Sequence, residues 1–514
     1  MKVQRLQTEV LAWASRPFAP GHVALALLAW ALPSAAQQSG PARAWVVTPT
    51  FTASETYTDV QRNTGFSGGE FVTQVSPGIQ MSSRSGRVQG SLSYALTASH
   101  HSRNSQGDVY QNALSSQVAV EAVEKWMYVD ARASISQQSI SAYGEQTVFD
   151  PSRSSANQTE VATLSVSPYV RGTLAGLANY ELRLNASANN ARNSVVSDST
   201  TTGASVSLSS PRQGAVLGWG LSATHQKVDF RAGRATESDR VSLTLTARPY
   251  PDLQLGLSGG MEATNVGSTG RQSYDNWGGS LRWTPTERTA IGLQADRRYF
   301  GNAHSISFEH RMRRMAWRFS DSRSATGGGD PNGVGQPISL FDLYFLLFAS
   351  QQPDPALREL MVLDYLRLIG RSPNEMVGRG LLNSAVSLQR RQDLSLAILG
   401  VRSTINLQAF TTQTRSLDNL IAVPAVESVT QRGATATLSY RLTPLSSVSL
   451  NGAWQRTLDT PTRAGNDLKS LLLGWTGQLS RTATGSLNVR HSRFHSSTAP
   501  YDQTSVSAAI SLRF

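Results

Sequence analysis

The charged side chains with the most suggestive spacing lie between residues 296 and 318. They occupy three consecutive stretches of alternating sequence, always opposite the apolar positions: Asp296, Arg298, Glu309, Arg311 and Arg318. Alternate side chains of a strand share a face, so the pattern predicts that all five point away from the apolar face. An arginine that faced lipid near the middle of a membrane would cost about 2–4 kcal/mol, which favours a water-filled side for this cluster.

Two kinds of chemistry fit these five residues. They could form a ladder of ion pairs that stiffens a wall of strands. They could instead line a passage and select for an anionic polymer, because rows of arginine favour anions. The sequence leaves both interpretations open.

Residues that would indicate catalysis or a bound metal are not arranged for it. None of the eight histidines has the spacing of a zinc site, and the chain has neither a Gly-x-Ser-x-Gly turn nor a phosphate-binding loop. His491 and His495 lie near serines, but histidines on the polar face of a strand explain them better. With no cysteine, a site for a soft metal is not expected. We therefore expect no enzyme, no cofactor and no metal.

The elements that would position the charged cluster are strands. The last stretch illustrates them: Thr504, Val506, Ala508, Ile510, Leu512 and Phe514 alternate with serines, Ala509 and Arg513. A final strand with outward apolar residues and a terminal aromatic resembles the assembly signal of bacterial outer-membrane barrels, although a half-buried strand of a soluble domain would look similar. The non-apolar face of most stretches holds Ser, Thr, Gln, Asn and Gly, as expected beside water.

Short turns alternate with long polar loops along the chain, including 144–159, 190–203, 266–274 and 418–431. This asymmetry is typical of outer-membrane barrels, which have tight periplasmic turns and longer external loops. We predict an all-β fold, a large antiparallel transmembrane β-barrel over 37–514 with about 22 strands (range about 16–24). Two of the predicted strands begin near residues 380 and 394. Both ends of the barrel would be periplasmic, and aromatic residues near strand ends would form interfacial girdles: Trp45, Trp126, Tyr128, Trp219, Trp283, Trp317, Tyr440 and Trp454.

One segment, 327–378, interrupts the strand pattern. Three glycines precede an apolar stretch, and Asp354-Pro355 then has the features of a helix start, with Gly370 as its end. We predict a small helical insertion in an extracellular or lumenal loop. It could be a hairpin that hides its own apolar surface, or a gate or plug of the barrel.

The N-terminal residues read as an export signal. Basic residues precede an apolar core at about 23–32, and small residues fit cleavage after Ala36, so 1–36 is predicted to be a signal peptide. No segment after it is apolar enough for a spanning helix, which excludes an inner-membrane protein. The formal net charge of +12 comes mostly from arginine, yet no basic run with interleaved aromatics indicates nucleic acid. Without cysteine there is no lipoprotein anchor, so membrane attachment must come from the fold.

Three stretches resemble the PEP-CTERM system-associated outer-membrane protein family. They are 283–289 (Trp-Thr-Pro-Thr-Glu-Arg-Thr), 297–301 (Arg-Arg-Tyr-Phe-Gly) and 308–317, with Phe308, Glu309, His310, Arg311, Arg313, Arg314 and Trp317. The stretch 166–172 is similar too, and the likeness extends over most of 40–514. The family consists of barrels encoded beside exopolysaccharide genes. The resemblance implies a role in exopolysaccharide production or export and supplies no catalytic residues.

From these patterns we expect an integral protein of the outer membrane of a Gram-negative bacterium that serves exopolysaccharide export as a passive conduit. The alternatives are a structural or assembly component of the export machinery, and a general porin. The expected partners are outer-membrane lipid, the barrel-assembly machinery, an anionic exopolysaccharide and periplasmic export proteins, with no nucleic acid. The sequence does not identify the glycan.

Overall fold

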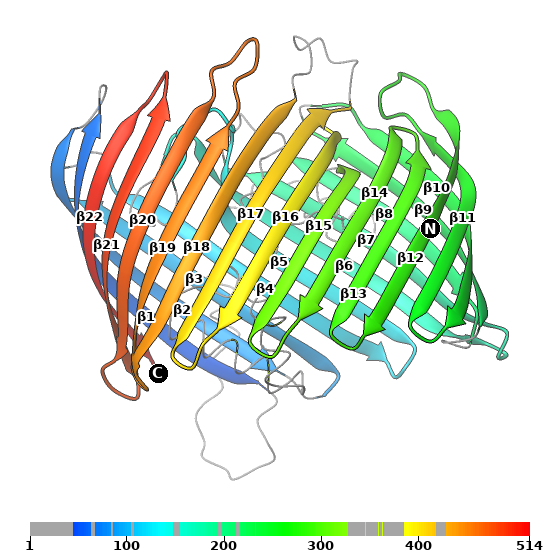
Figure 1. Ribbon diagram of the computed structural model, residues 1–514, viewed down its shortest axis with the longest axis horizontal. Helices are drawn as coiled ribbons and strands as arrows, with labels where there is room; N and C mark the ends of the chain where they lie inside the picture. Colours follow the sequence, from blue (N-terminus) through cyan, green and yellow to red (C-terminus); the bar gives the residue numbers. More distant parts are fainter. Residues whose placement is uncertain are drawn as a thin grey trace, which may run out of the picture. The chain divides into compact units, whose positions relative to one another are not determined.

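A closed β-barrel accounts for nearly all of the chain that the computed structural model describes (Figure 1). The described residues are 45–62, 67–83, 86–103, 107–147, 155–192, 198–211, 216–231, 233–326, 345, 358, 362, 385–417 and 428–514. The chain divides into Met1–Val46, almost all of it outside the described residues, and Val47–Phe514, which forms the barrel.

Twenty-two strands of 10 to 17 residues are found among the described residues. The first eleven are β1 (Val46–Arg62), β2 (Gly68–Ser83), β3 (Val88–His101), β4 (Val109–Val123), β5 (Met127–Ser139), β6 (Gln158–Leu174), β7 (Ala178–Ala191), β8 (Ser199–Ser209), β9 (Leu217–Phe230), β10 (Thr236–Tyr250) and β11 (Leu253–Thr264). The others are β12 (Gln272–Thr286), β13 (Thr289–Arg298), β14 (Gly301–Arg311), β15 (Met315–Thr326), β16 (Ser387–Leu399), β17 (Ser403–Ser416), β18 (Val429–Thr443), β19 (Ser446–Thr457), β20 (Asn466–Gln478), β21 (Ala483–Ser496) and β22 (Tyr501–Arg513).

Each strand pairs with its neighbours in the sequence, and the first strand pairs with the last. The β1–β22 pairing is antiparallel and runs from Thr50↔Arg513 to Arg62↔Tyr501. This pairing closes the sheet, so every strand has a hydrogen-bonded neighbour on both sides. In Figure 1 the blue β1 and the red β22 lie side by side, and all strands slope across the wall, as closure of a barrel requires.

The two faces of the wall differ as the alternation predicts. On the last strand, Val506 and Ile510 face outward and are about half exposed, whereas Gln503 and Ser505 face inward and are buried. The same division holds around the barrel: the exposed large side chains are mostly Leu, Val, Trp and Tyr, and the buried ones are mostly Ser, Thr, Asn and Gln. The molecule is therefore apolar outside and polar inside, the reverse of a soluble domain.

The two ends of the barrel also differ. At one end, which we call the turn end, the strands are joined by tight turns such as 251–252, 287–288 and 444–445. At the other, the loop end, the connections are longer, with 140–157 and 265–271 as examples. One exception is the two-residue turn Tyr299-Phe300 between β13 and β14 at the loop end, where Gly301 adopts a positive φ of 97°. β1 begins and β22 ends at the turn end.

Most predictions about the fold are confirmed, and some are not. The antiparallel barrel and its strand number agree with the prediction. The strands expected to begin near 380 and 394 begin instead at Ser387 and Ser403, because both form hydrogen-bonded ladders that start later. Tyr128 is not part of an outer girdle: it faces inward and stacks on another tyrosine.

The predicted helical insertion at 327–378 lies almost entirely outside the described residues, which include only Phe345, Arg358 and Val362 of it. A helix or plug there stays a prediction, and so does the signal peptide at 1–36. Among the residues described, no helix has both the length and the apolar character needed to cross a membrane.

Candidate functional site

The loop between β5 and β6, residues 140–157, folds against the inside of the barrel. We call it the lumen loop; its residues 140–147 and 155–157 are described. One side chain organises it: Asn157 donates from Nδ2 to the carbonyls of Ser141 (2.8 Å) and Glu145 (3.1 Å) and accepts from the Ser141 N–H (2.9 Å). The Asn157 amide therefore holds the two described arms of the loop, 140–147 and 155–157, against each other.

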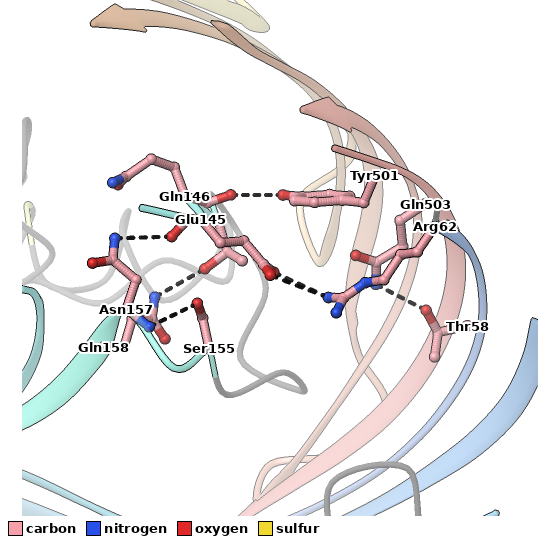
Figure 2. Close-up of polar contacts among 10 residues, drawn as sticks. Thr58, Arg62, Glu145, Gln146, Ser155, Asn157, Gln158, Tyr501 and Gln503 are labelled. Carbon is pink, nitrogen blue, oxygen red and sulfur yellow. Dashed lines mark hydrogen bonds and ion pairs between the residues drawn. The ribbon is translucent and has the colours of Figure 1, made fainter. Parts of the chain in front are cut away.

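The lumen loop is fixed to a distant part of the wall by hydrogen bonds to its backbone carbonyls. Thr457 Oγ1 and Asn466 Nδ2 both donate to the carbonyl of Ala142, at 3.0 and 2.8 Å. The Tyr501 hydroxyl donates to the carbonyl of Gln146 at 2.7 Å (Figure 2). These donors lie on β19, β20 and β22, and the ring of strands passes through all of β1–β4 before it reaches β5. The loop therefore crosses part of the interior rather than remaining outside the mouth.

Burial makes these contacts significant. Ala142, Gln146, Thr457 and Tyr501 are each at most 6 % exposed. Beside them lies a small apolar cluster of inward-facing wall residues, Val60, Leu468, Phe494 and Tyr501. A buried carbonyl left without a donor costs about 1–3 kcal/mol, so the loop and the wall favour each other's position.

An ion pair adds a charged contact at the same place. Arg62 at the end of β1 donates from Nη2 to Glu145 Oε1 at 3.1 Å, and both side chains are largely covered (Figure 2). In a partly buried setting such a bond is stronger than at the surface, because water screens it less. Three hydrogen-bond donors and one cation of the wall thus hold the loop; we call Arg62, Thr457, Asn466 and Tyr501 the latch.

The structure divides the five charged residues singled out in the sequence between the two ends of the wall. Strand register places all five on the inward face. Asp296 and Arg298 lie at the loop end of β13. Glu309 of β14 lies opposite Ala290 in the register. Ala290 is six positions from Asp296 along β13, so Glu309 and Asp296 are about 20 Å apart along the wall. They therefore do not form one continuous ladder.

At the loop end, Arg298 has a partner that sequence spacing did not indicate. Its Nε and Nη2 donate to Glu262 Oε2 and Oε1 at 2.7 and 2.6 Å, a bidentate pair. Glu262, on β11, is 1 % exposed, and Arg240 of β10 is its direct neighbour in the register. This group is a buried ion pair with a second guanidinium group on the adjacent strand.

At the turn end, the three remaining residues lie close together. Arg311 Nε is 3.7 Å from Glu309 Oε1, and Arg318 is opposite Glu309 in the register of β14 and β15. All three are partly exposed on the inward face. Two guanidinium groups with one carboxylate leave a net positive charge on the lumen wall here.

A second cluster of inward-facing side chains lies at the turn end, and the sequence did not indicate a function for it. Tyr128 and Tyr169 stack with ring centroids 5.2 Å apart, and the guanidinium of Arg171 lies 4.4 Å from the centroid of Tyr128. Arg183 lies 3.8 Å from the centroid of Tyr169 and pairs with Asp130 at 3.0 Å. The order of the stretch around Tyr169 and Arg171 had suggested a family likeness, but only the pairing of β5, β6 and β7 shows that these rings and cations meet.

A second loop, 265–271 between β11 and β12, also folds inward at the loop end. Arg234 holds it, with Nη2 donating to the Asn265 carbonyl and Nη1 to the Ser268 carbonyl, both at 2.7 Å. It contributes Val266 to an apolar cluster with Val228, Phe230, Val386, Tyr299, Ala325 and Leu417. Burial, with the Glu262 carboxylate nearby, raises the pKa of the Tyr299 hydroxyl in the adjoining turn, so it remains neutral.

These elements form a polar interior narrowed by folded loops. Within the described part of the chain, no group of His, Asp and Glu side chains is arranged to hold a metal ion. The inward surface offers hydroxyls, amides and guanidinium groups, which are hydrogen-bond partners for hydrophilic and anionic groups. Sequence reasoning missed the lumen loop, because nothing in the loop's own composition indicates that its carbonyls meet donors more than 300 positions away.

Comparison with known proteins gives matches among solved structures alone. No protein-family model and no curated protein matches the chain. Among solved structures, the FrpB iron transporter from Neisseria meningitidis is 10 % identical, with 90 % of this chain and 82 % of that chain covered and a TM-score of 0.48. The siderophore receptor PirA from Pseudomonas aeruginosa is 10 % identical, with 91 % and 80 % covered and a TM-score of 0.39. OmpT of Vibrio cholerae, lacking loop L8, is 7 % identical, with 92 % and 100 % covered and a TM-score of 0.30.

Proposed function

We propose that this protein is an integral barrel of the Gram-negative outer membrane and a passive conduit for a hydrophilic polymer. The apolar exterior supports the membrane location, because closed barrels satisfy every backbone hydrogen bond within the wall and can face lipid. The loop end would face outward and the turn end the periplasm, since long loops are external in such barrels.

The observation that carries the conduit proposal is the latched lumen loop. A barrel that serves only as an anchor has no need of a loop fixed across its interior. A conduit does, because a loop with fixed position reduces the free cross-section without closing it. Since buried wall donors bind its carbonyls, this constriction is permanent, in contrast to a mobile gate.

The proposed cargo is an exopolysaccharide with anionic groups. Hydroxyl and amide side chains on the inward face offer the contacts that sugars make with proteins. Arginines on that face outnumber carboxylates in the strand register; besides those named above they include Arg132, Arg282, Arg391 and Arg490. A positive lumen favours anions, and the sequence resemblance suggests the export of such a polymer.

Planar bilayer recordings test the conduit directly. The purified wild-type protein should conduct, and a variant with Thr457→Val, Asn466→Ala and Tyr501→Phe should conduct more, because the loop is released from the wall. A matched control, Tyr57→Phe on the outward face of β1, should leave the conductance unchanged. If neither the wild type nor the released variant conducts, the conduit is rejected.

A deletion strain tests the cargo. Loss of the gene should reduce exopolysaccharide at the cell surface, and the wild-type gene should restore it. Unchanged exopolysaccharide together with nonselective conductance would indicate a general porin. Lost exopolysaccharide without any conductance would indicate a structural or assembly component of the export machinery.

A further inference from the structure

A shallow apolar groove runs along the outward face of β16–β21. Its volume is about 780 Å³. The floor of the groove consists of small residues on neighbouring strands, Ala409, Ala434, Ala436 and Gly452. Its sides are formed by the large side chains of Leu394, Leu396, Leu407, Trp454 and Leu471. In register, the floor residues follow one another across the strands as Ala409↔Ala434 and Ala436↔Gly452. Small side chains beside large ones thus create a hollow in an otherwise bulky apolar belt.

The loop end of this groove is bordered by cations. Lys469, Arg493 and His491 belong to its lining. Lys469 and Arg493 lie directly opposite each other in the register of β20 and β21. The Lys469 and Arg493 side chains are 68 % and 56 % exposed. Arg456 and Arg432 continue the row on β19 and β18, where they are paired with each other.

Carboxylates offset only part of this charge. Asp467 lies 3.8 Å from Lys469 Nζ and accepts a hydrogen bond from Trp454 Nε1 at 2.9 Å. Asp502 accepts from Arg493 Nε at 2.9 Å. Four cations against two carboxylates leave the rim positive, before any charge on His491.

We propose that this groove binds a phosphorylated, acylated lipid of the outer leaflet, with an acyl chain in the groove and a phosphate at Lys469 and Arg493. The apolar floor and the cationic rim match the two halves of such a lipid in the order in which a membrane presents them. A second copy of this chain fits less well, because a two-fold contact within the membrane would bring like cationic rims to the same depth. The proposal uses the membrane location but does not depend on conduction.

Native mass spectrometry of the detergent-purified full chain tests the lipid site, with diphosphoryl lipid A as the probe. Lys469→Ala/Arg493→Ala should bind it about 30-fold more weakly, the loss expected for two cations at a lipid surface. Gly452→Leu tests the groove alone. A Cβ at this position meets only Leu471 Cδ1 at 4.0 Å, so the larger side chain should fill the hollow, leave every charge in place and weaken binding.

The matched control removes two cations elsewhere on the outer surface, with Lys227→Ala/Arg231→Ala at the loop end of β9, and should bind the lipid as the wild type does. Heat-dependent gel mobility verifies that each variant is folded. Equal binding by Gly452→Leu and the wild type would overturn the proposal, and so would equal binding of the dephosphorylated lipid or displacement of the lipid by inorganic phosphate. Unchanged bilayer conductance of Lys469→Ala/Arg493→Ala separates this result from the conduit test.

Discussion

The hydroxyl of Tyr501 donates to the backbone carbonyl of Gln146 across 355 positions of sequence, at 2.7 Å and out of contact with solvent. The tyrosine ring is stacked on Phe494, with centroids 5.4 Å apart, so the hydroxyl has little freedom to move. A strand at the closure of the barrel thereby fixes a loop that starts five strands away. Position of the loop and closure of the wall are consequently linked.

Tyr501→Phe should loosen the lumen loop without unfolding the barrel. The ring and its stacking remain, but the Gln146 carbonyl loses its donor, a change worth about 1–3 kcal/mol. Hydrogen exchange should become faster at residues 140–147 and stay unchanged in the strands. Tyr440→Phe, on the outward face, is the control; equal exchange in both variants would show that the hydroxyl does not hold the loop.

The pair of Arg62 and Glu145 should contribute a measurable interaction energy. In a double-mutant cycle of Arg62→Gln and Glu145→Gln, the coupling should be about 1–3 kcal/mol, because the bond is largely covered. The stability of the barrel in urea is the measurement. The exposed pair Arg87–Glu124 at the turn end provides the comparison and should give a coupling below about 1 kcal/mol. Similar couplings for both pairs would contradict the prediction.

Arg298→Gln should destabilise the barrel more than any other single change in the predicted charge cluster. It leaves the buried Glu262 carboxylate without its bidentate partner, which costs about 3–5 kcal/mol. The added change Glu262→Gln should recover most of the loss in urea unfolding. A single Arg298→Gln as stable as Arg318→Gln would show that the pair contributes little.

Ion selectivity should depend on the turn-end residues instead. Arg311→Gln/Arg318→Gln removes two lumenal cations that are partly exposed, so the reversal potential in a salt gradient should shift toward cations. Arg456→Gln, on the outward face of β19, removes a charge that does not face the passage and should leave the potential unchanged. The same shift in both variants would assign selectivity to the surface of the barrel.

Much of the barrel was predictable because alternation is local. Val506, Ile510 and their serine neighbours show which face meets lipid, and many other strands have the same alternation. The starts of β16 and β17 are predicted too early. Apolar residues occupy both odd and even positions of 380–394, so alternation alone does not fix where a strand begins. Hydrogen-bonded pairing with β15 decides where β16 begins.

The site was predictable only in part. Parity assigned Asp296, Arg298, Glu309, Arg311 and Arg318 to one face, but it does not report depth along the strand, so it could not separate the two ends. Glu262 was missed because its partner is 36 positions away, on the next strand but one. The lumen loop was expected outside, since only the folded wall shows the donors that hold its carbonyls.

The pairing of β1 with β22 has a consequence for biogenesis. One edge of β1 has no hydrogen-bonded partner until β22 pairs with it, so the backbone N–H and C=O groups of that edge must be shielded before then. Insertion is therefore completed only after β22 has been inserted. A chain that lacked the hairpin of β21 and β22 would expose two unpaired strand edges to hydrocarbon. Such a truncated product should be degraded before it reaches its destination.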